Sequence, residues 1–532
     1  MIDVVIRNGF VIDGTGKPGY PGDIAIEGDK IVVMAPALGQ IQAKHEIDAS
    51  GMVVSPGFVD LHTHSDFTLL VNGKAESQVH QGVTFEAIGN CGHGCAPVLG
   101  DPAVLKRSII GHSDHVEISW RTFAEYLNFL ERLPLGVNVA AYVGHGPLRL
   151  GVLSGEQRPA KPEEIKSMTK LLDQCLEEGA IGFSTGLEYA PGNSARTEEL
   201  LALCESTNQA GRVYATHVRN RDYFYEQGIG EALAVARLSG VPTQLSHITP
   251  KYGAPAHATE RALEMIDWTK SAGVDVAFDV IPHEWGPTLL SAVLPSWAFE
   301  GGLPALQERL RNPETREMMK NNPLTIWKLV PAKRWDQLIL FASTANPEYI
   351  GMTFEQIGKL RGQDPHDAIF DILLEDGEDI YSATWIGHTI TEADLKMTMA
   401  ESDCAVMSDT ITLAPYGDLA DKKFAPSSYG WVARWLGHYS RDQRVVSIEE
   451  AIRRITSLPA KRLALKRRGS LVEDNFADIT VFDLNSIEDQ STINEPNVYP
   501  KGIKYVLVNG QLAIDNGVRT DINAGRVIRA DG

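Results

Sequence analysis

The chain has 532 residues, of which 43% are hydrophobic and 22% are charged. A chain of this length and composition can bury a large core, so it is not a disordered protein, and we expect one large domain with a smaller one. The formal net charge of −20, from 69 acidic and 49 basic residues, argues against nucleic acid or an anionic membrane surface as a partner, because both need clustered lysine and arginine.

Cysteine usage and the N-terminus indicate the compartment. Five cysteines are an odd number without the spacing of a small disulfide framework, which favours a reducing environment. The first residues lack the basic and apolar regions of a signal peptide, and no apolar run reaches the roughly 18 residues of a membrane span. We therefore expect a cytoplasmic protein without a membrane partner, and the sequence leaves open whether it forms a homo-oligomer.

Both ends of the chain show the same β-type pattern. Residues 1–54 read as short strands separated by turns, with Asn8-Gly9 and Gly28-Asp29 as turn signals. Residues 467–532 repeat this pattern around Asn509-Gly510. We predict that the two ends together form one small β-sandwich domain.

Between these ends, apolar β-type runs alternate with helical segments, which is typical of an α/β fold with a parallel sheet. Eight such runs are present: 54–61, 83–88, 137–143, 180–184, 212–216, 242–246, 274–280 and 404–407. Eight strands predict a closed (β/α)8 TIM barrel over residues 55–466. Because residues 281–403 separate the last two runs, we also predict an insertion over about 285–350 that caps the barrel mouth as a lid.

Side chains of the metal-ligand type follow five of these runs. His62 and His64 stand two residues apart after the first run, so in an extended strand they project to the same face. An isolated His-x-His is more often incidental, but Cys91, His217, His247 and Asp409 follow four later runs. The C-terminal ends of barrel strands meet at one mouth, so these six side chains are expected to meet there.

The predicted donor set suits zinc. Four imidazoles, a thiolate and a carboxylate match an ion that accepts nitrogen, sulfur and oxygen ligands. Six donors exceed the four of one tetrahedral ion, so we expect two neighbouring sub-sites with Cys91 as a bridge. A single occupied site is the alternative.

Short motifs surround these side chains along nearly the whole chain. They are residues 56–66 (PGFVDLHTHSD), 89–92 (GNCG), 184–189 (STGLEY), 216–220 (THVRN), Ser246-His247 and Ser408-Asp409. In this order they resemble the metal-dependent amidohydrolase superfamily, and within it the D-aminoacylase (N-acyl-D-amino-acid deacylase) family. The close of the chain is also similar, in residues 457–460 (SLPA) and 505–510 (YVLVNG).

The resemblance implies a zinc-dependent enzyme that hydrolyses a linear amide C–N bond in a small molecule, an N-acyl amino acid or a related N-acyl amine. It implies a tightly bound zinc on Cys91, His217 and His247, and a second, weaker position formed by His62, His64 and Asp409. In this branch a cysteine replaces the carboxylated lysine of dihydropyrimidinase-like relatives, and Cys91 matches it. Asp409 is expected to take the proton of the attacking water and deliver it to the leaving nitrogen.

The substrate contacts implied by the resemblance are altered in this chain. Thr249, His283 and Ser427 stand where relatives hold a substrate carboxylate with a lysine, a tyrosine and an arginine. Losing a charged partner of a buried carboxylate costs several kcal/mol. Either other cations, such as Lys251 or Arg434, bind a carboxylate here, or the substrate has none at this position.

Three more side chains lie near the expected mouth. His145 follows the third run and either contacts substrate or holds its loop by a hydrogen bond. Glu188 follows the fourth run and is expected to support a ligand, since Cys91 already fills the bridging position. His93 is a candidate for the pocket wall.

Two other functions are kept open. A hydrolase of neutral aryl or cyclic amides, like dihydropyrimidinases, uses similar chemistry, but the bridging lysine is missing. A non-catalytic scaffold predicts broken ligands, and none is broken here.

Overall fold

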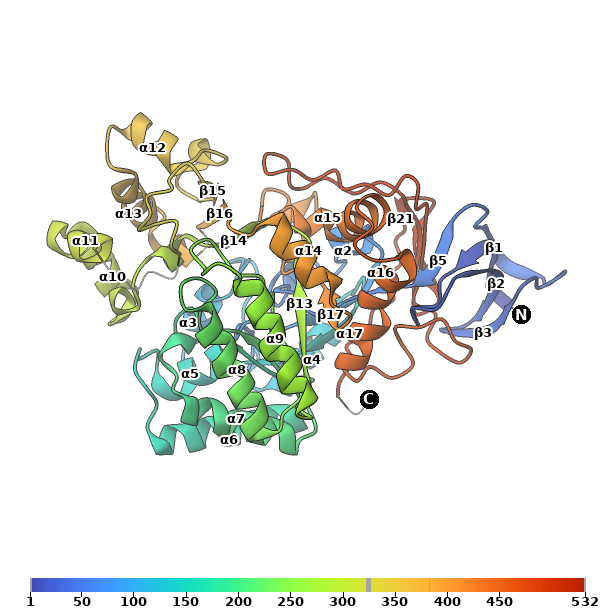
Figure 1. Cartoon of the computed structure of the whole chain (residues 1–532), viewed down its shortest axis with the longest axis horizontal. Helices are drawn as coiled ribbons and strands as arrows, with labels where there is room; N and C mark the ends of the chain where they lie inside the picture. The colour runs from blue at the N-terminus through green and yellow to red at the C-terminus, as the bar shows by residue number, and fades with distance from the viewer. Residues whose placement is uncertain (1, 322–326, 382, 531–532) are drawn as a thin grey trace.

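The computed structural model describes residues 2–321, 327–381 and 383–530, so residues 322–326 of the predicted insertion and the last two residues of the predicted terminal domain lie outside the described residues. The chain has an α/β fold of the TIM-barrel type. Strands from both chain ends lie on one side of the barrel, and the insertion lies on the opposite side (Figure 1).

Both chain ends contribute to one nine-stranded sheet. Its strands are β1 (Ile2–Val11), β2 (Tyr20–Glu27), β3 (Lys30–Ala35), β4 (Ala43–Asp48), β5 (Val53–Pro56), β18 (Ile479–Phe482), β19 (Ile503–Val508), β20 (Gln511–Asp515) and β21 (Val518–Arg519). The order is β21-β20-β19-β18-β5-β1-β2-β3, and β4 also pairs with β1. The two ends of the chain therefore meet where β18 pairs with β5.

The predicted turns of this sheet have different outcomes. The prediction of a turn at Asn8-Gly9 is wrong, because β1 continues through it and its pairing with β2 shifts register between Ile6 and Gly9. Asn8 has a left-handed φ of 57°, so this site is a β-bulge. Asn509 (φ 48°) and Gly510 (φ 78°) do connect β19 to β20, and positive φ at both central residues is typical of a type I′ hairpin turn.

The predicted parallel strands form two sheets, with orders β6-β7-β8 and β17-β13-β12-β11-β10-β9. Their bounds are β6 (Phe58–Asp60), β7 (Val83–Ile88), β8 (Asn138–Ala141), β9 (Val143–Gly144), β10 (Gly182–Gly186), β11 (Val213–His217), β12 (Thr243–Leu245), β13 (Val276–Val280) and β17 (Cys404–Val406). At Tyr142, which lies between β8 and β9, the backbone N–H donates to the carbonyl of Ile88 at 2.9 Å. At the other edge, a parallel bridge joins Thr63 to Thr410.

The first predicted strand, residues 54–61, is divided in the structure. β5 belongs to the terminal sheet, β6 belongs to the barrel sheet, and Gly57 lies between them. A Cβ atom on Gly57 would overlap the side chain of Thr84, so a glycine is needed where the chain passes from one sheet to the other. The predicted boundary at residue 54 therefore falls inside β5.

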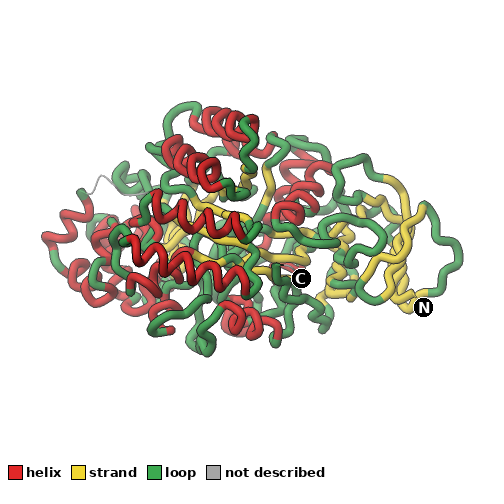
Figure 2. Tube along the Cα trace, turned by 90° about the horizontal axis from the view of Figure 1, so that it is seen from below, coloured by secondary structure: helices red, strands yellow, loops and turns green. Residues whose placement is uncertain are grey.

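Helices cover the outside of the parallel strands, and Figure 2 shows helices lying across them. The α-helices of this part of the chain are α1 (Thr68–Val71), α2 (Glu76–Val79), α3 (Pro102–Arg107), α4 (Phe123–Glu131), α5 (His145–Leu153), α6 (Pro162–Glu177), α7 (Thr197–Gln209), α8 (Tyr225–Ser239), α9 (Ala258–Ser271), α14 (Glu392–Ala400), α15 (Ser427–Ala433), α16 (Ile448–Arg454) and α17 (Ser457–Arg462). From α5 to α9, each helix packs against the next along the chain. Local signals set their ends: α4 begins with a capping box of Thr122 and Glu125, and α8 ends at the left-handed Gly240.

The insertion is longer than predicted. It continues beyond residue 350 because β16 (Thr384–His388) pairs with both β14 (Trp285–Leu289) and β15 (Leu338–Ala342). The helices α10 (Gly302–Arg311), α11 (Pro313–Lys320), α12 (Phe354–Arg361) and α13 (Pro365–Glu375) complete it. It has its own hydrophobic core, in which Trp385 is fully buried. Its action as a lid stays a prediction.

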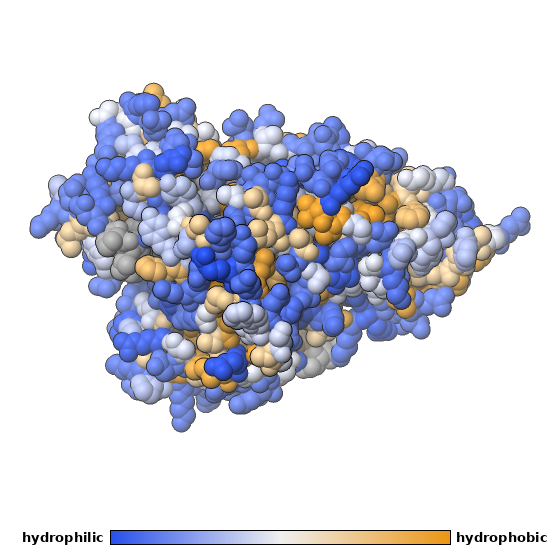
Figure 3. Space-filling model, viewed as in Figure 1, coloured by the Kyte–Doolittle hydropathy of each residue, from blue (hydrophilic) through white to orange (hydrophobic). Residues whose placement is uncertain are grey.

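The visible surface is mainly polar. Figure 3 shows apolar residues in small groups between hydrophilic ones, which fits the large net charge. None of the described helices has the length and apolar character needed to cross a bilayer.

Candidate metal centre

All six ligand candidates lie at the C-terminal ends of parallel strands. His62 and His64 follow β6, Cys91 follows β7, and Asp409 follows β17; His217 ends β11 and His247 follows β12. The ends of β6 and β17 are joined directly. The N–H of His64 donates to the carbonyl of Thr410 at 2.7 Å, and the N–H of Asp409 donates to that of His62 at 3.1 Å. These bonds explain why residues so distant in sequence share one site.

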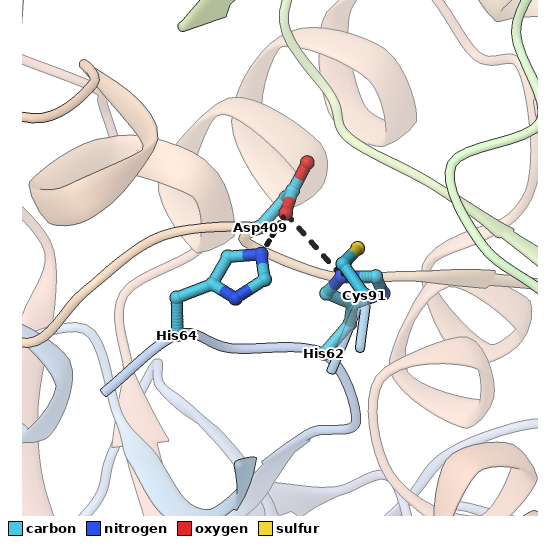
Figure 4. Close-up of side chains that lie close together, drawn as sticks. All are labelled: His62, His64, Cys91 and Asp409. Atoms are coloured by element: carbon cyan, nitrogen blue, oxygen red, sulfur yellow. Dashed lines mark hydrogen bonds and ion pairs between the residues drawn. The ribbon is translucent and has the colours of Figure 1, made fainter. Parts of the chain in front are cut away.

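The six side chains form two groups that share Cys91. His62, His64, Cys91 and Asp409 make one group; Cys91, His217 and His247 make the other, and within each group the donor atoms lie within 4.8 Å of one another. In Figure 4, Asp409 and Cys91 both lie beside the ring of His62. Asp409 Oδ1 is 3.1 Å from His64 Nε2 and 3.3 Å from His62 Nε2.

The spacing around Cys91 fits a zinc ion. A zinc–sulfur bond of about 2.3 Å and a zinc–nitrogen bond of about 2.05 Å at a tetrahedral angle place the two donors about 3.6 Å apart. Cys91 Sγ lies 3.3 Å from His247 Nε2 and 3.8 Å from His217 Nδ1. The donor set and its spacing therefore suit a metal centre.

Three of the ligand candidates have a strained backbone. Cys91 (φ 52°), His247 (φ 37°) and Asp409 (φ 48°) all adopt the left-handed region, which is uncommon for residues other than glycine. Each such residue costs of order 1–3 kcal/mol and persists only where its surroundings hold it. For His247 the support is Asp279, whose Oδ1 accepts the His247 N–H at 2.6 Å.

The charges of the group favour the ligand forms of Cys91 and Asp409. Burial raises the pKa of both groups, but the effect of the neighbouring histidines outweighs it. His62 and His247 lower the pKa of the Cys91 thiol well below its ordinary value, so the thiolate is favoured. The same two histidines hold the pKa of Asp409 well below its ordinary range. A thiolate and a carboxylate are the species that bind metal.

A carboxylate behind His217 fixes its ring. Glu188 Oε2 lies 2.7 Å from His217 Nε2, and the N–H of Arg221 donates to Glu188 Oε1 at 3.0 Å. Both oxygens of Glu188 also accept from Lys251. Burial opposes ionisation of Glu188, but the charges of Lys251 and His217 hold its pKa below the ordinary value. The predicted supporting position of Glu188 agrees with this geometry.

Tyr189 is a further residue of the site, and no role was predicted for it from the sequence. Its hydroxyl lies 3.0 Å from His217 Nδ1, and burial raises the pKa of Tyr189 well above its ordinary value, so it stays protonated. Its ring stacks on His93 at 5.6 Å, and His93 lies 5.4 Å from the ring of His64. Burial lowers the pKa of His93 to about 4, so it is neutral at pH 7. The signal available was the position of Tyr189 beside Glu188 after the fourth strand.

The four candidate substrate contacts are all buried, but they differ in their partners. His145 is fully buried and its Nε2 lies 2.7 Å from Glu199, which favours the alternative that it holds its loop. His283 Nε2 and Thr249 Oγ1 are buried without hydrogen-bond partners. Burial, together with the charges of Arg434 and His438, lowers the pKa of His283 well below its ordinary value, so it is neutral. Ser427 is the first residue of α15.

The two cations considered for a substrate carboxylate already face acidic groups. Lys251 is bound to Glu188, and Arg434 Nη2 lies 3.6 Å from Glu284.

Trp385 is a core residue of the insertion, in contact with Trp327 at 4.9 Å between ring centroids.

Known proteins resemble this chain along nearly its whole length. The model of the amidohydrolase family matches residues 45–292 and 420–514. D-aminoacylase of Alcaligenes xylosoxydans xylosoxydans is 30% identical over 99% of this chain and 97% of its own length, and the N-acyl-D-glutamate deacylase of that organism is 30% identical over 100% and 97%. The crystal structure of N-acyl-D-glutamate deacylase from Bordetella bronchiseptica, complexed with zinc and a phosphonate inhibitor, is 29% identical, covers 99% of this chain and 100% of its own, and superposes with a TM-score of 0.82. The chain belongs to the amidohydrolase family.

Proposed function

We propose that this protein is a zinc-dependent hydrolase that removes the acyl group from an N-acyl amino acid or a related N-acyl amine. The observation that carries the proposal is the convergence of Cys91, His217 and His247, whose donor atoms lie within 4.8 Å of one another. The zinc bound by the similar Bordetella bronchiseptica enzyme and the deacylase activities named for the relatives support it.

The proposed metal ligands follow the two groups. Cys91, His217 and His247 would hold one zinc tightly, because a thiolate and two imidazoles form a strong donor set. His62, His64 and Asp409 would form the weaker second position, with Cys91 as the shared ligand. Bound zinc supplies a water of lowered pKa and polarises the amide carbonyl.

Asp409 is proposed as the residue that moves the proton. Its carboxylate is ionised, partly exposed, and held by His62 and His64 at the mouth. It can therefore accept a proton from water at Oδ2 and return it to the departing nitrogen. The Tyr189 hydroxyl, which stays protonated, can donate a hydrogen bond to the amide oxygen as negative charge develops on it.

We also propose the domain organisation in its finer form. The parallel strands would close as one eight-stranded barrel, since contacts at Tyr142 and at Thr63 join both edges of the two sheets. The terminal sheet and its apolar core would form the small β-sandwich domain. The five cysteines are buried and unpaired, which supports a reducing compartment such as the cytoplasm.

Metal analysis and a substrate screen test the proposed function together. The purified protein is expected to contain zinc and to hydrolyse at least one N-acyl-D- or N-acyl-L-amino acid or N-acyl amine. Activity should be lost on chelation and restored by zinc. Neutral anilides and lactams serve as the comparison set. Turnover of lactams alone, with linear N-acyl compounds untouched, would contradict the proposal.

A further inference from the structure

A buried lysine lies behind the metal centre. Lys251 follows β12, and only 4% of it is exposed. Its Nζ lies 2.8 Å from Glu188 Oε1 and 2.7 Å from Glu188 Oε2, so it holds both oxygens of a carboxylate that is itself buried. Breaking a buried ion pair of this kind is strongly unfavourable, because the remaining partner is left as an uncompensated buried charge.

The carboxylate that Lys251 holds is bonded to a ligand candidate. Glu188 Oε2 lies 2.7 Å from Nε2 of His217, whose other nitrogen, Nδ1, faces Cys91. An ionised carboxylate can only accept, so the proton of the His217 imidazole is placed on Nε2. Nδ1 then presents its lone pair toward the metal position. A carboxylate bonded in this way raises the basicity of a metal ligand and fixes its ring.

The insertion holds Lys251 from the other side. Lys251 Nζ lies 3.8 Å from the ring centroid of Trp327, a cation–π contact. Trp327 is buried in the core of the insertion, in contact with Trp385. A continuous set of contacts therefore runs from the insertion through Lys251 and Glu188 to His217.

We propose that Lys251 is a positioning residue, which sets the orientation and tautomer of His217 through Glu188, and that it is not the group that binds a substrate carboxylate. The inference rests on the proposed zinc-dependent function and deepens it. A substrate carboxylate bound by Lys251 would compete with Glu188 and leave that buried acid without its cation, which is strongly unfavourable. Groups other than Lys251 therefore recognise the amino-acid or amine part of the substrate, including any carboxylate that it carries.

Zinc affinity, measured by competition with a chromophoric chelator, tests the positioning role. Loss of such supporting contacts typically weakens metal binding about 10- to 100-fold. Lys251→Met and Glu188→Gln are each expected to fall in this range, and Lys251→Arg should recover most of the affinity. Lys328→Met is the matched control: Lys328 is also buried, and the ring of Tyr223 is among its contacts, at 5.0 Å. It should bind zinc as the unchanged protein does.

Steady-state kinetics at saturating zinc separate positioning from substrate binding. The substrates are an N-acyl amino acid that the protein hydrolyses and the same compound with its carboxylate capped as a primary amide. Lys251→Met is expected to change KM for the two compounds by the same factor. Unchanged zinc affinity, with KM raised only for the carboxylate compound, would overturn the inference.

A double variant keeps the test informative if Lys251→Met does not fold. Glu188→Gln with Lys251→Met removes both charges, so no buried charge is left uncompensated. It should bind zinc no more weakly than Glu188→Gln alone, because both changes break the same chain of contacts. Additive losses would overturn the inference. If the unchanged protein itself binds no zinc, the proposed function fails first, and that result is distinct from all of these.

Discussion

Replacement of Asp409 by asparagine removes the proposed proton carrier with little change of shape. Oδ1 of the carboxylate lies 3.1 Å from His64 Nε2 and 3.3 Å from His62 Nε2, and an asparagine oxygen can take the same position. The amide nitrogen cannot accept the proton of water. General acid–base catalysis typically contributes about 10²- to 10⁴-fold, so kcat should fall by that factor, or about 3 to 5 kcal/mol.

The assay combines turnover with zinc content. Cys91, His217 and His247 do not include Asp409, so Asp409→Asn should retain the tightly bound zinc while kcat falls. Asp403→Asn is the control, since Asp403 lies at the opposite end of strand β17 and pairs with Lys270. The control should keep normal turnover. A kcat within threefold of the unchanged protein in Asp409→Asn would refute the proton-carrier role.

Two further predictions concern stability. Burial lowers the pKa of His366 to about 4 from the ordinary 6.5, so below pH 6.5 the unfolded chain takes up a proton that the folded chain does not. At about 1.4 kcal/mol per pH unit, the protein should lose about 2 kcal/mol of unfolding free energy between pH 6.5 and 5.0. His366→Phe should reduce this loss. A loss of equal size in the variant would contradict the role of His366. Arg468 is buried against Asp478, which also contacts the barrel residue Asn138, so Arg468→Met should cost about 3 to 5 kcal/mol by leaving Asp478 unpaired. Chemical denaturation measures this, and restoration by a second change, Asp478→Leu, is the expected control; equal instability of the double variant would argue against the charge as the cause.

The parts of the site that the sequence predicted are those with a local signal. His62 and His64 end an apolar run at strand spacing, and Cys91 stands in a glycine-rich turn after the next run. Their residue types and positions were therefore enough to predict them as ligand candidates. The left-handed backbone of Asp409 has no such signal, because its N–H donates to the carbonyl of His62, which lies far away in the sequence. The contacts of Lys251 with Glu188 and Trp327 span three separate segments and could not be read from one of them.

The same distinction between local and long-range signals applies to the fold. Alternation of apolar runs and amphipathic helices predicted the parallel strands to within a few residues. The end of the insertion was not predicted because it depends on the antiparallel pairing of β16 with β14, which joins Trp285 to His388. No local sequence pattern predicts this pairing. The bulge at Asn8-Gly9 was read as a turn, since the same two residues favour positive φ in both.

X-ray absorption at the zinc edge tests the central claim most directly, because it reports the atoms bound to the metal. With zinc on Cys91, His217 and His247, the spectrum should show one sulfur at about 2.3 Å and nitrogen or oxygen neighbours at about 2.0–2.1 Å. The sulfur contribution should disappear in Cys91→Ser. A zinc-loaded, active protein whose spectrum contains no sulfur neighbour would contradict the account.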